Sequence, residues 1–244
     1  TGWYTLSLHD ALPILISEAV FRQSNVAKIA HKCTFLRKMM RNSMYKDCLK
    51  RFFDLVVGLS FLPFFVILAI PISLIIKLDS SGPIFFRQKR AGRNGKYFNI
   101  LKFRSMSSCS ISEKKEFEPG EKKRITRFGA FLRKSKLDEI PQIINVILGD
   151  MSLVGPRPEV KKYIEKSPER WQKILSIRPG ITDPASISFR NEEEILAASS
   201  DPEKEYIENI MPTKLSLYEK YLTEISFTHD VKILLSTILT LFIK

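Results

Sequence analysis

The sequence predicts a mainly α-helical protein with small β elements, in which a re-entrant membrane helix carries a compact globular domain on the cytoplasmic side. Three observations support this fold class. Residues 52–76 form a long apolar run, basic residues flank that run on both sides, and apolar residues beyond residue 126 recur mostly at helical spacing. The predicted parts are an unassigned N-terminal segment (1–45), the membrane-embedded helix (46–79), a cytoplasmic domain that carries the candidate catalytic residues (80–230) and an apolar C-terminal helix (231–244).

Residues 1–45 show no clear periodic pattern, and we assign them no function. The stretch LSLHDALPI at 6–14 resembles a translated sequencing adapter joined in frame to a gene fragment. Our hypothesis is that the segment is partly artefactual, and the alternative is a native terminus without regular structure. Finding the same codons at the native locus would reject the hypothesis.

The apolar run at residues 52–76 is the strongest physical feature of the sequence. Its one charge is Asp54, and a straight helix of this length, rising about 1.5 Å per residue, would span a bilayer core of about 30 Å. Pro63 and Pro71 interrupt the run and can bend or break a helix. Because basic flanks prefer the cytoplasm, a helix that enters, bends and returns is favoured over a straight span. A buried core helix is the remaining alternative.

The rest of the chain is predicted to combine short extended segments with helices. We expect strands at 84–86 and 97–103 around a turn at 92–95, and a mobile loop at 107–124. Helices are expected over 127–149 with a break near Leu137, over 159–176, and over 191–226 with interruptions at Pro202 and Pro212; loops are expected at 152–158 and 178–183. The apolar C-terminal helix suits a membrane interface or core packing equally well.

Composition narrows the class of partners. The chain has 244 residues, 44% of them hydrophobic, and a net charge of +13, which favours phosphates, nucleic acid or anionic lipid. The three cysteines are scattered without a CxxC motif, which fits a reducing compartment, and the three histidines lack zinc-ligand spacing.

Asp138 and Glu139 are the first candidates for chemistry. The isoleucines that follow them have helical spacing, and Pro141 fits only a first helical turn, so Asp138 is predicted as an N-cap with Glu139 just inside the helix. An ionised carboxylate there can attack a phosphoryl group, and its neighbour can hold a divalent metal. The alternative is an acidic pair that only caps a helix.

Basic residues surround this acidic pair. Two stretches, 80–112 and 122–137, each hold seven basic residues and no acidic one: Arg87, Lys89, Arg90, Arg93, Lys96, Lys102 and Arg104, then Lys122, Lys123, Arg124, Arg127, Arg133, Lys134 and Lys136. Such surroundings suit phosphoryl transfer between anions, because the substrates' charge must be offset before a negative nucleophile approaches. A solvated face that holds anionic lipid is the alternative.

Two stiff turns each present one arginine. Arg157 lies in VGPRP at 154–158 and Arg178 lies in IRPGIT at 177–182. A rigid turn can present a guanidinium at a defined angle for bidentate phosphate binding, although ordinary turn chemistry would also produce these patterns.

Four segments together resemble the bacterial sugar transferase family of monotopic polyprenol-phosphate phosphoglycosyl transferases. They are KRFFDLVVG (50–58), SGPIFFRQKRAGRNGKYFNILKFRSM (81–106), TRFGAFLRKSKLDEIPQIINVILGDMSLVGPRP (126–158) and RPGITDPASI (178–187). The resemblance covers residues 50–243, roughly four-fifths of the chain. Many members break the membrane helix at a central Ser-Pro pair, whereas Pro63 and Pro71 have other neighbours here, which leaves the break point open. The chain resembles the small form of the family, because no bundle of membrane helices precedes the run.

The resemblance implies transfer of a sugar-1-phosphate from a UDP-sugar to undecaprenyl (polyprenol) phosphate, with release of UMP, at the start of bacterial surface glycan synthesis. Asp138 matches the catalytic nucleophile, which would form a covalent phosphosugar–aspartate intermediate. Glu139 matches the second catalytic carboxylate, which would bind the Mg2+ cofactor. Substrate-binding positions are matched by Lys102, Arg133, Arg157 and Arg178. The implied location is the cytoplasmic face of the bacterial inner membrane, with membrane lipid as a partner.

Two other functions were weighed. A non-enzymatic, basic, membrane-anchored binding module is compatible with the charge and the apolar segments, but leaves the Asp-Glu pair without a role. A nucleic-acid binder is not expected, because no recognised motif occurs and the apolar run argues against it.

Overall fold

The computed structural model describes residues 45–107 and 124–242. The chain divides into two units, Thr1–Asp47 and Cys48–Lys244, and the account below concerns the second. The predictions for residues 1–44, for most of the loop at 107–124 and for Lys122 and Lys123 lie outside the described residues.

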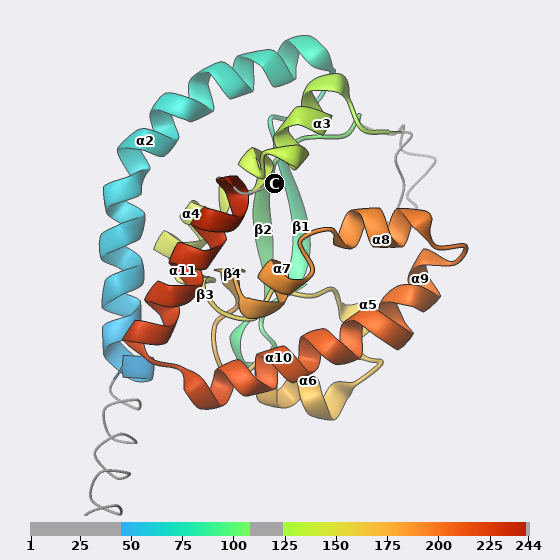
Figure 1. The fold of residues 1–244 in the computed structure, drawn as a ribbon. Coiled ribbons are helices and arrows are strands. Elements are labelled where there is room, and N and C mark those ends of the chain that lie inside the picture. The colour runs from blue at the N-terminus through green and yellow to red at the C-terminus, as the bar shows by residue number, and fades with distance from the viewer. Residues whose placement is uncertain (1–44, 108–123, 243–244) are drawn as a thin grey trace, which may run out of the picture. The chain divides into compact units, whose positions relative to one another are not determined.

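Helix α2 (Lys50–Asp79) follows a π-helical turn, η1 (Tyr45–Leu49), and is a single helix of 30 residues. It continues through both prolines, and Figure 1 shows it as an arch along the unit. Each proline removes a hydrogen bond and crowds the preceding turn, which bends a helix. The bend predicted at Pro63 and Pro71 is therefore present as curvature within a continuous helix.

Most of α2 is apolar and uncovered. Among the described residues it is the one helix long and apolar enough to cross a membrane, and only 17% of its most apolar stretch is buried. This low burial argues against the core-helix alternative. The side that faces the unit carries Lys50, Asp54, Gly58, Phe65, Ile72 and Ile76.

Strands β1 (Phe85–Ala91) and β2 (Tyr97–Phe103) form an antiparallel hairpin, with Phe85 opposite Phe103 and Ala91 opposite Tyr97. The second strand has the predicted bounds, whereas the first, expected at 84–86, continues to Ala91 because it pairs with β2 along its whole length. The turn η2 (Arg93–Gly95) has positive φ at Asn94 and Gly95, as tight hairpin turns require. The free edge of β2 is closed by a side chain of α4. Asn145 accepts from Leu101 N at 3.0 Å and donates to Asn99 O at 2.9 Å, so the edge is not left open to pair with another chain.

The predicted helix at 127–149 with a break near Leu137 is confirmed. It consists of α3 (Arg127–Lys134), the 3₁₀ turn η3 (Leu137–Glu139) and α4 (Gln142–Leu148), which ends at Gly149 with a φ of 95°. The predicted N-cap role of Asp138 is wrong. Lys136 adopts the left-handed conformation (φ 57°), so Asp138 falls inside η3 and Pro141 takes the N-cap position of α4.

The two predicted loops at 152–158 and 178–183 contain a short parallel sheet that the sequence analysis missed. Strand β3 (Ser152–Val154) pairs with β4 (Gly180–Thr182), in a register that places Ser152 opposite Gly180. The backbones approach closely: a Cβ on Gly180 would lie 2.1 Å from Gly155 N. Only glycine leaves room for this contact.

Helices make up the remainder of the unit. They are α5 (Lys161–Ile164), α6 (Pro168–Ile174), α7 (Pro184–Ser188), α8 (Glu192–Ala198), α9 (Pro202–Glu205), the π turn η4 (Tyr206–Ile210), α10 (Met211–Glu224) and α11 (Phe227–Phe242). Trp171, Tyr206, Leu215 and Tyr218 form part of a buried apolar cluster among them. The interruption predicted at Pro202 is confirmed, because α8 ends at Ala198 and α9 begins at Pro202. At Pro212 the chain stays helical from α9 through η4 into α10, and the irregularity takes the form of the π turn η4 directly before α10.

Helix α11 begins beside the N-terminal end of α2 and slants away from it (Figure 1). Phe227 packs edge-on against Phe53 of α2, with ring centroids 5.3 Å apart. On the inner side Ile233 is buried, whereas Leu235, Ile238 and Leu239 are exposed on the outer side. The predicted C-terminal helix thus has an inner face that packs on the core and an outer apolar face that is open.

Candidate active site

A cavity of about 3460 Å³ lies between the hairpin, α3, η3, α7 and α8. Five of the six residues predicted from the sequence line it: Lys102, Arg133, Asp138, Glu139 and Arg157. They come from β2, α3, η3 and the loop after β3, so the fold gathers side chains from four separate segments at one place.

Glu139 is held by two cations. Lys102 Nζ donates to its Oε1 at 2.7 Å, and Arg157 donates through Nη1 to Oε2 at 3.3 Å and through Nη2 to Oε1. Burial opposes the ionisation of Glu139, but the charges of Arg157 and Lys102 outweigh it and hold the pKa of Glu139 well below its usual range. The same ion pair raises the pKa of Arg157. Glu139 is therefore a permanent negative charge clamped between two donors.

Lys102 is the weaker of the two cations. Burial lowers the pKa of its ammonium, and the negative charge of Glu139 offsets only part of this effect. A buried lysine beside a carboxylate is typical of functional sites, although structural ion pairs also perturb pKa values.

Asp138 differs from its neighbour. It is 7% exposed, and its Oδ1 has no hydrogen-bond partner among the described residues. Burial raises the pKa of Asp138 to about 6; Lys102 opposes this rise and Glu139 adds to it. Buried polar atoms are nearly always satisfied, so this carboxylate oxygen in the cavity wall is a candidate for contact with a ligand, an ion or a water molecule.

Arg133 and Arg178 have separate locations. Arg133 lies in the cavity wall, where its Nη2 donates to Glu193 Oε1 of α8 at 2.8 Å. Arg178 does not line the cavity. Its Nε donates to Gly149 O at 2.9 Å, at the C-terminus of α4, where a cation interacts favourably with the helix dipole.

Several basic residues of the two predicted runs have structural partners. Arg104 donates to the carbonyls of Ile76 and Ser80 at 3.2 and 2.6 Å, which satisfies the C-terminal end of α2. Arg90 bonds to Glu159 at 2.9 Å. The positive charge of these runs thus serves the fold as well as the cavity.

The sequence analysis did not single out Asp54 as a positioning residue. It is 2% exposed and accepts hydrogen bonds from Ser152 Oγ at 3.1 Å and from Leu153 N at 3.0 Å. These bonds tie α2 to β3, which leads into the Arg157 loop. Its position as the single charge in an apolar run was the signal that could have identified it.

Asp138 and Glu139 are also candidate ligands for a metal ion. No group of three or more metal-ligating side chains occurs in the part of the chain that the structure describes. Asp138 with its unpartnered oxygen and Glu139 form a two-carboxylate set, which fits Mg2+ when phosphate and water supply the other ligands. The residues present therefore fit a magnesium ion that binds together with a phosphorylated substrate.

Comparison of the sequence with known proteins identifies the family to which this chain belongs. Residues 45–244 match the family described as bacterial sugar transferase. A UDP-N-acetylgalactosamine-undecaprenyl-phosphate N-acetylgalactosaminephosphotransferase of Aeromonas hydrophila is 37% identical over 57% of this chain and 34% of its own length. UDP-glucose:undecaprenyl-phosphate glucose-1-phosphate transferases of Xanthomonas campestris pv. campestris and Escherichia coli (strain K12) are 42% and 34% identical. Those two matches cover 51% and 80% of this chain and 27% and 40% of the relatives.

The chain thus spans between about a quarter and two-fifths of the length of these three relatives. The family match, in contrast, extends over most of the chain, from residue 45 to residue 244. It includes the cavity, the acidic pair and both arginine-bearing turns. The chain belongs to the bacterial sugar transferase family.

Proposed function

We propose that the protein transfers a sugar-1-phosphate from a UDP-sugar to undecaprenyl (polyprenol) phosphate, giving the polyprenol-diphosphate-sugar and UMP. The observation that carries this proposal is the acidic pair in the cavity wall: Asp138, whose buried Oδ1 has no hydrogen-bond partner among the described residues, lies next to a Glu139 held by Lys102 and Arg157. The names of the relatives support the substrate classes. They differ in the sugar, so the proposal extends to no particular donor.

The proposed reaction has two displacements at one phosphorus atom. The carboxylate of Asp138 attacks the phosphate that bears the sugar, and the bond to the second phosphate breaks so that UMP leaves with the electron pair. A phosphate oxygen of the polyprenol phosphate then attacks the phosphosugar–aspartate, and the bond to Asp138 breaks, which regenerates the carboxylate. The product then initiates a surface glycan.

The cations explain how anions can meet in this cavity. Asp138, the diphosphate and the acceptor phosphate all carry negative charge, so attack needs that charge to be offset beforehand. Lys102, Arg133 and Arg157 line the same cavity and are suited to bind the phosphate oxygens. Arg157 can do so bidentately, since its planar guanidinium matches phosphate geometry.

We further propose that Mg2+ is the cofactor and that Glu139 would hold it, which leaves Asp138 to act as the nucleophile. The ion would neutralise charge on the diphosphate. In this structure both oxygens of Glu139 bond to Lys102 and Arg157. Arrival of the donor's phosphates would give these two cations new partners and leave Glu139 to the metal.

The proposed location is the cytoplasmic face of the inner membrane, with α2 re-entrant. Near one end of α2, Asp54 bonds to β3; in its middle, Phe65 stacks on Phe103 of β2 at 6.3 Å; at its other end, Arg104 bonds to Ser80. Both ends of α2 and its middle therefore contact the same globular part. A helix that crossed the bilayer would place its two ends on opposite sides of the membrane, so only one end could contact that part. This contact pattern, with the open apolar face of α2, supports a helix that dips into one leaflet and returns.

Release of UMP is the direct test. Purified protein in nanodiscs would receive Mg2+, undecaprenyl phosphate and a panel of UDP-sugars, beside Asp138→Asn as control. UMP from one donor, lost in the variant, is the expected result. UMP release that persists in Asp138→Asn would reject the proposed nucleophile. Folded protein that binds anionic lipid but releases UMP from no donor, even as full-length native protein, would favour the membrane-anchored binding module.

A further inference from the structure

The loop that carries Arg157 also contains a carboxylate, Glu159, which the proposed reaction does not use. Glu159 is 9% exposed and lies two residues after Arg157. Its Oε1 accepts a hydrogen bond from Arg90 Nη1 at 2.9 Å, and its Oε2 accepts one from the Tyr206 hydroxyl at 2.6 Å. Arg90 belongs to β1 and Tyr206 to η4, so Glu159 joins two distant parts of the chain to this loop.

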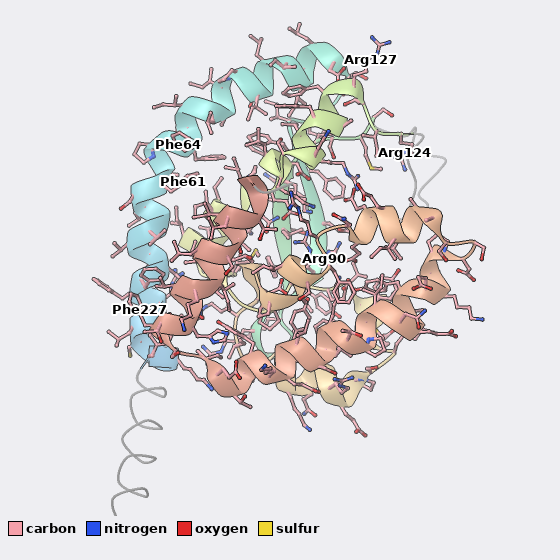
Figure 2. All side chains as sticks on the ribbon, viewed as in Figure 1. Phe61, Phe64, Arg90, Arg124, Arg127 and Phe227 are labelled. Atoms are coloured by element: carbon pink, nitrogen blue, oxygen red, sulfur yellow. The ribbon has the colours of Figure 1, made fainter. Side chains whose placement is uncertain are left out.

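Further bonds hold the same stretch of loop on the hairpin. Ala91 N donates to Glu159 O at 2.9 Å, and Arg90 Nη1 also donates to Pro158 O at 3.3 Å. Gln88 Oε1 accepts from Arg90 Nε and Nη2 at 3.1 and 2.8 Å, which orients the guanidinium. Figure 2 shows Arg90 in the interior of the unit, among the side chains between the hairpin and the helices that follow.

The other flank of Arg157 is held by the parallel strands. Gly155 N donates to Thr182 O at 3.0 Å, and Gly180 N donates to Pro156 O at 3.0 Å. Arg157 is therefore fixed by its neighbours on both sides, while its own guanidinium reaches into the cavity to Glu139. A guanidinium that is held in place before the ligand arrives loses less freedom on binding, so the loop's anchors control how tightly Arg157 can bind a phosphate.

We propose that Arg90, Glu159 and Tyr206 form a positioning clamp that aims Arg157 at the diphosphate of the donor. The identity of that ligand rests on the proposed function. Of the three, Tyr206 can be altered with the least disturbance, because replacing it with phenylalanine removes one hydroxyl and keeps the ring in the apolar cluster. Burial, with the charge of Glu159, raises the pKa of Tyr206 well above its usual range, so the hydroxyl stays a donor at every working pH.

The test measures UDP affinity in the presence of Mg2+, the KM and kcat for the donor, and the Tm. Tyr206→Phe should weaken UDP binding and raise the donor KM by about tenfold, the usual effect of losing a hydrogen bond to a charged group, with kcat nearly unchanged. Glu159→Gln should have a smaller effect, because its amide oxygen still accepts one bond. The matched control is Ile210→Val, which trims a buried side chain of the same turn that cannot hydrogen-bond to Glu159; it should lower the Tm and leave UDP affinity unchanged.

A double-mutant cycle separates positioning from general loosening. If the clamp acts through Arg157, Tyr206→Phe should cause no further loss of UDP affinity in an Arg157→Ala background. Unchanged UDP affinity in Tyr206→Phe, or an equal loss with and without Arg157, would overturn the clamp.

The clamp and the proposed function fail in different ways. If UDP affinity depends on Tyr206 through Arg157 but no UDP-sugar yields UMP, the clamp stands and the proposed function falls. If UMP is released but Tyr206→Phe binds UDP like the wild type, only the clamp falls. A wild-type protein that neither binds UDP nor releases UMP overturns both.

Discussion

Replacing Asp138 with asparagine should make the protein more stable at neutral and alkaline pH, while abolishing transfer. The reasoning starts from the pKa of Asp138, which burial raises from 3.8 to about 6. A carboxylate whose folded-state pKa is raised favours the folded state when protonated. The stability of the wild type should therefore fall as pH rises from about 4 to about 6, and then stay level. Asparagine keeps the shape of the side chain and removes this ionisation cost.

The size of the effect follows from the shift. A rise of about two pKa units corresponds to about 3 kcal/mol of free energy of unfolding at pH 8, which is the upper limit of what Asp138→Asn can regain. The new amide must find its own hydrogen bonds, so the observed gain will be smaller. For a domain of this size, a gain of about 2 kcal/mol raises the Tm by roughly 4–8 °C.

Thermal unfolding can be followed in detergent or nanodiscs through the fluorescence of Trp171, which is 2% exposed. The measurement is made at pH 8 and again at pH 4.5, where the gain should shrink to about a third, because wild-type Asp138 is then already protonated in the folded state. A variant that melts at or below the wild-type temperature at pH 8 would refute the reasoning. So would a gain of the same size at both pH values.

Three further predictions concern the same site and its support. Glu139→Gln should lower the free energy of unfolding by about 3 kcal/mol at pH 7, because it leaves Arg157 and Lys102 without their partner; a Tm equal to the wild type's would contradict this. The pH profile of kcat/KM should fall on the acidic side with an apparent pKa near 6, because only ionised Asp138 can attack, and a rate that stays constant down to pH 4.5 would exclude Asp138 as the titrating group. Gly180→Ala should abolish folding or cost more than about 3 kcal/mol, because its Cβ would lie 2.1 Å from Gly155 N; near wild-type denaturant unfolding would show that β3 and β4 can separate at little cost.

Elements that depend on interactions between residues close in sequence could be predicted from local sequence patterns. The apolar run produced α2, the glycine-rich turn produced the hairpin, and Gly149 ends α4 with a positive φ. The acidic pair and three of the four basic residues expected from a resemblance, Lys102, Arg133 and Arg157, do line one cavity. These features depend on the periodicity of apolar residues or on backbone preferences of single residues, which a sequence displays directly.

Features that depend on pairing between distant parts of the chain were not predicted from the sequence. Strands β3 and β4 have three residues each and are stabilised by one another, so neither has a periodic pattern of its own. Arg178 looked equivalent to Arg157, yet the first bonds to the end of α4 and the second to Glu139. Glu159 and Asp54 owe their partners to contacts 47 and about 99 positions away. No local pattern encodes such contacts.

The central claim is that Asp138 carries the phosphosugar between donor and acceptor. The most direct test is to mix the protein with Mg2+ and a competent UDP-sugar, omit the polyprenol phosphate, quench, and measure the mass of the peptide that contains Asp138. The expected result is an adduct of one sugar phosphate on that residue, with one UMP released per adduct, and loss of the adduct when polyprenol phosphate is added. An unmodified peptide, with UMP formed only when donor and acceptor are both present, would show direct transfer and contradict the account.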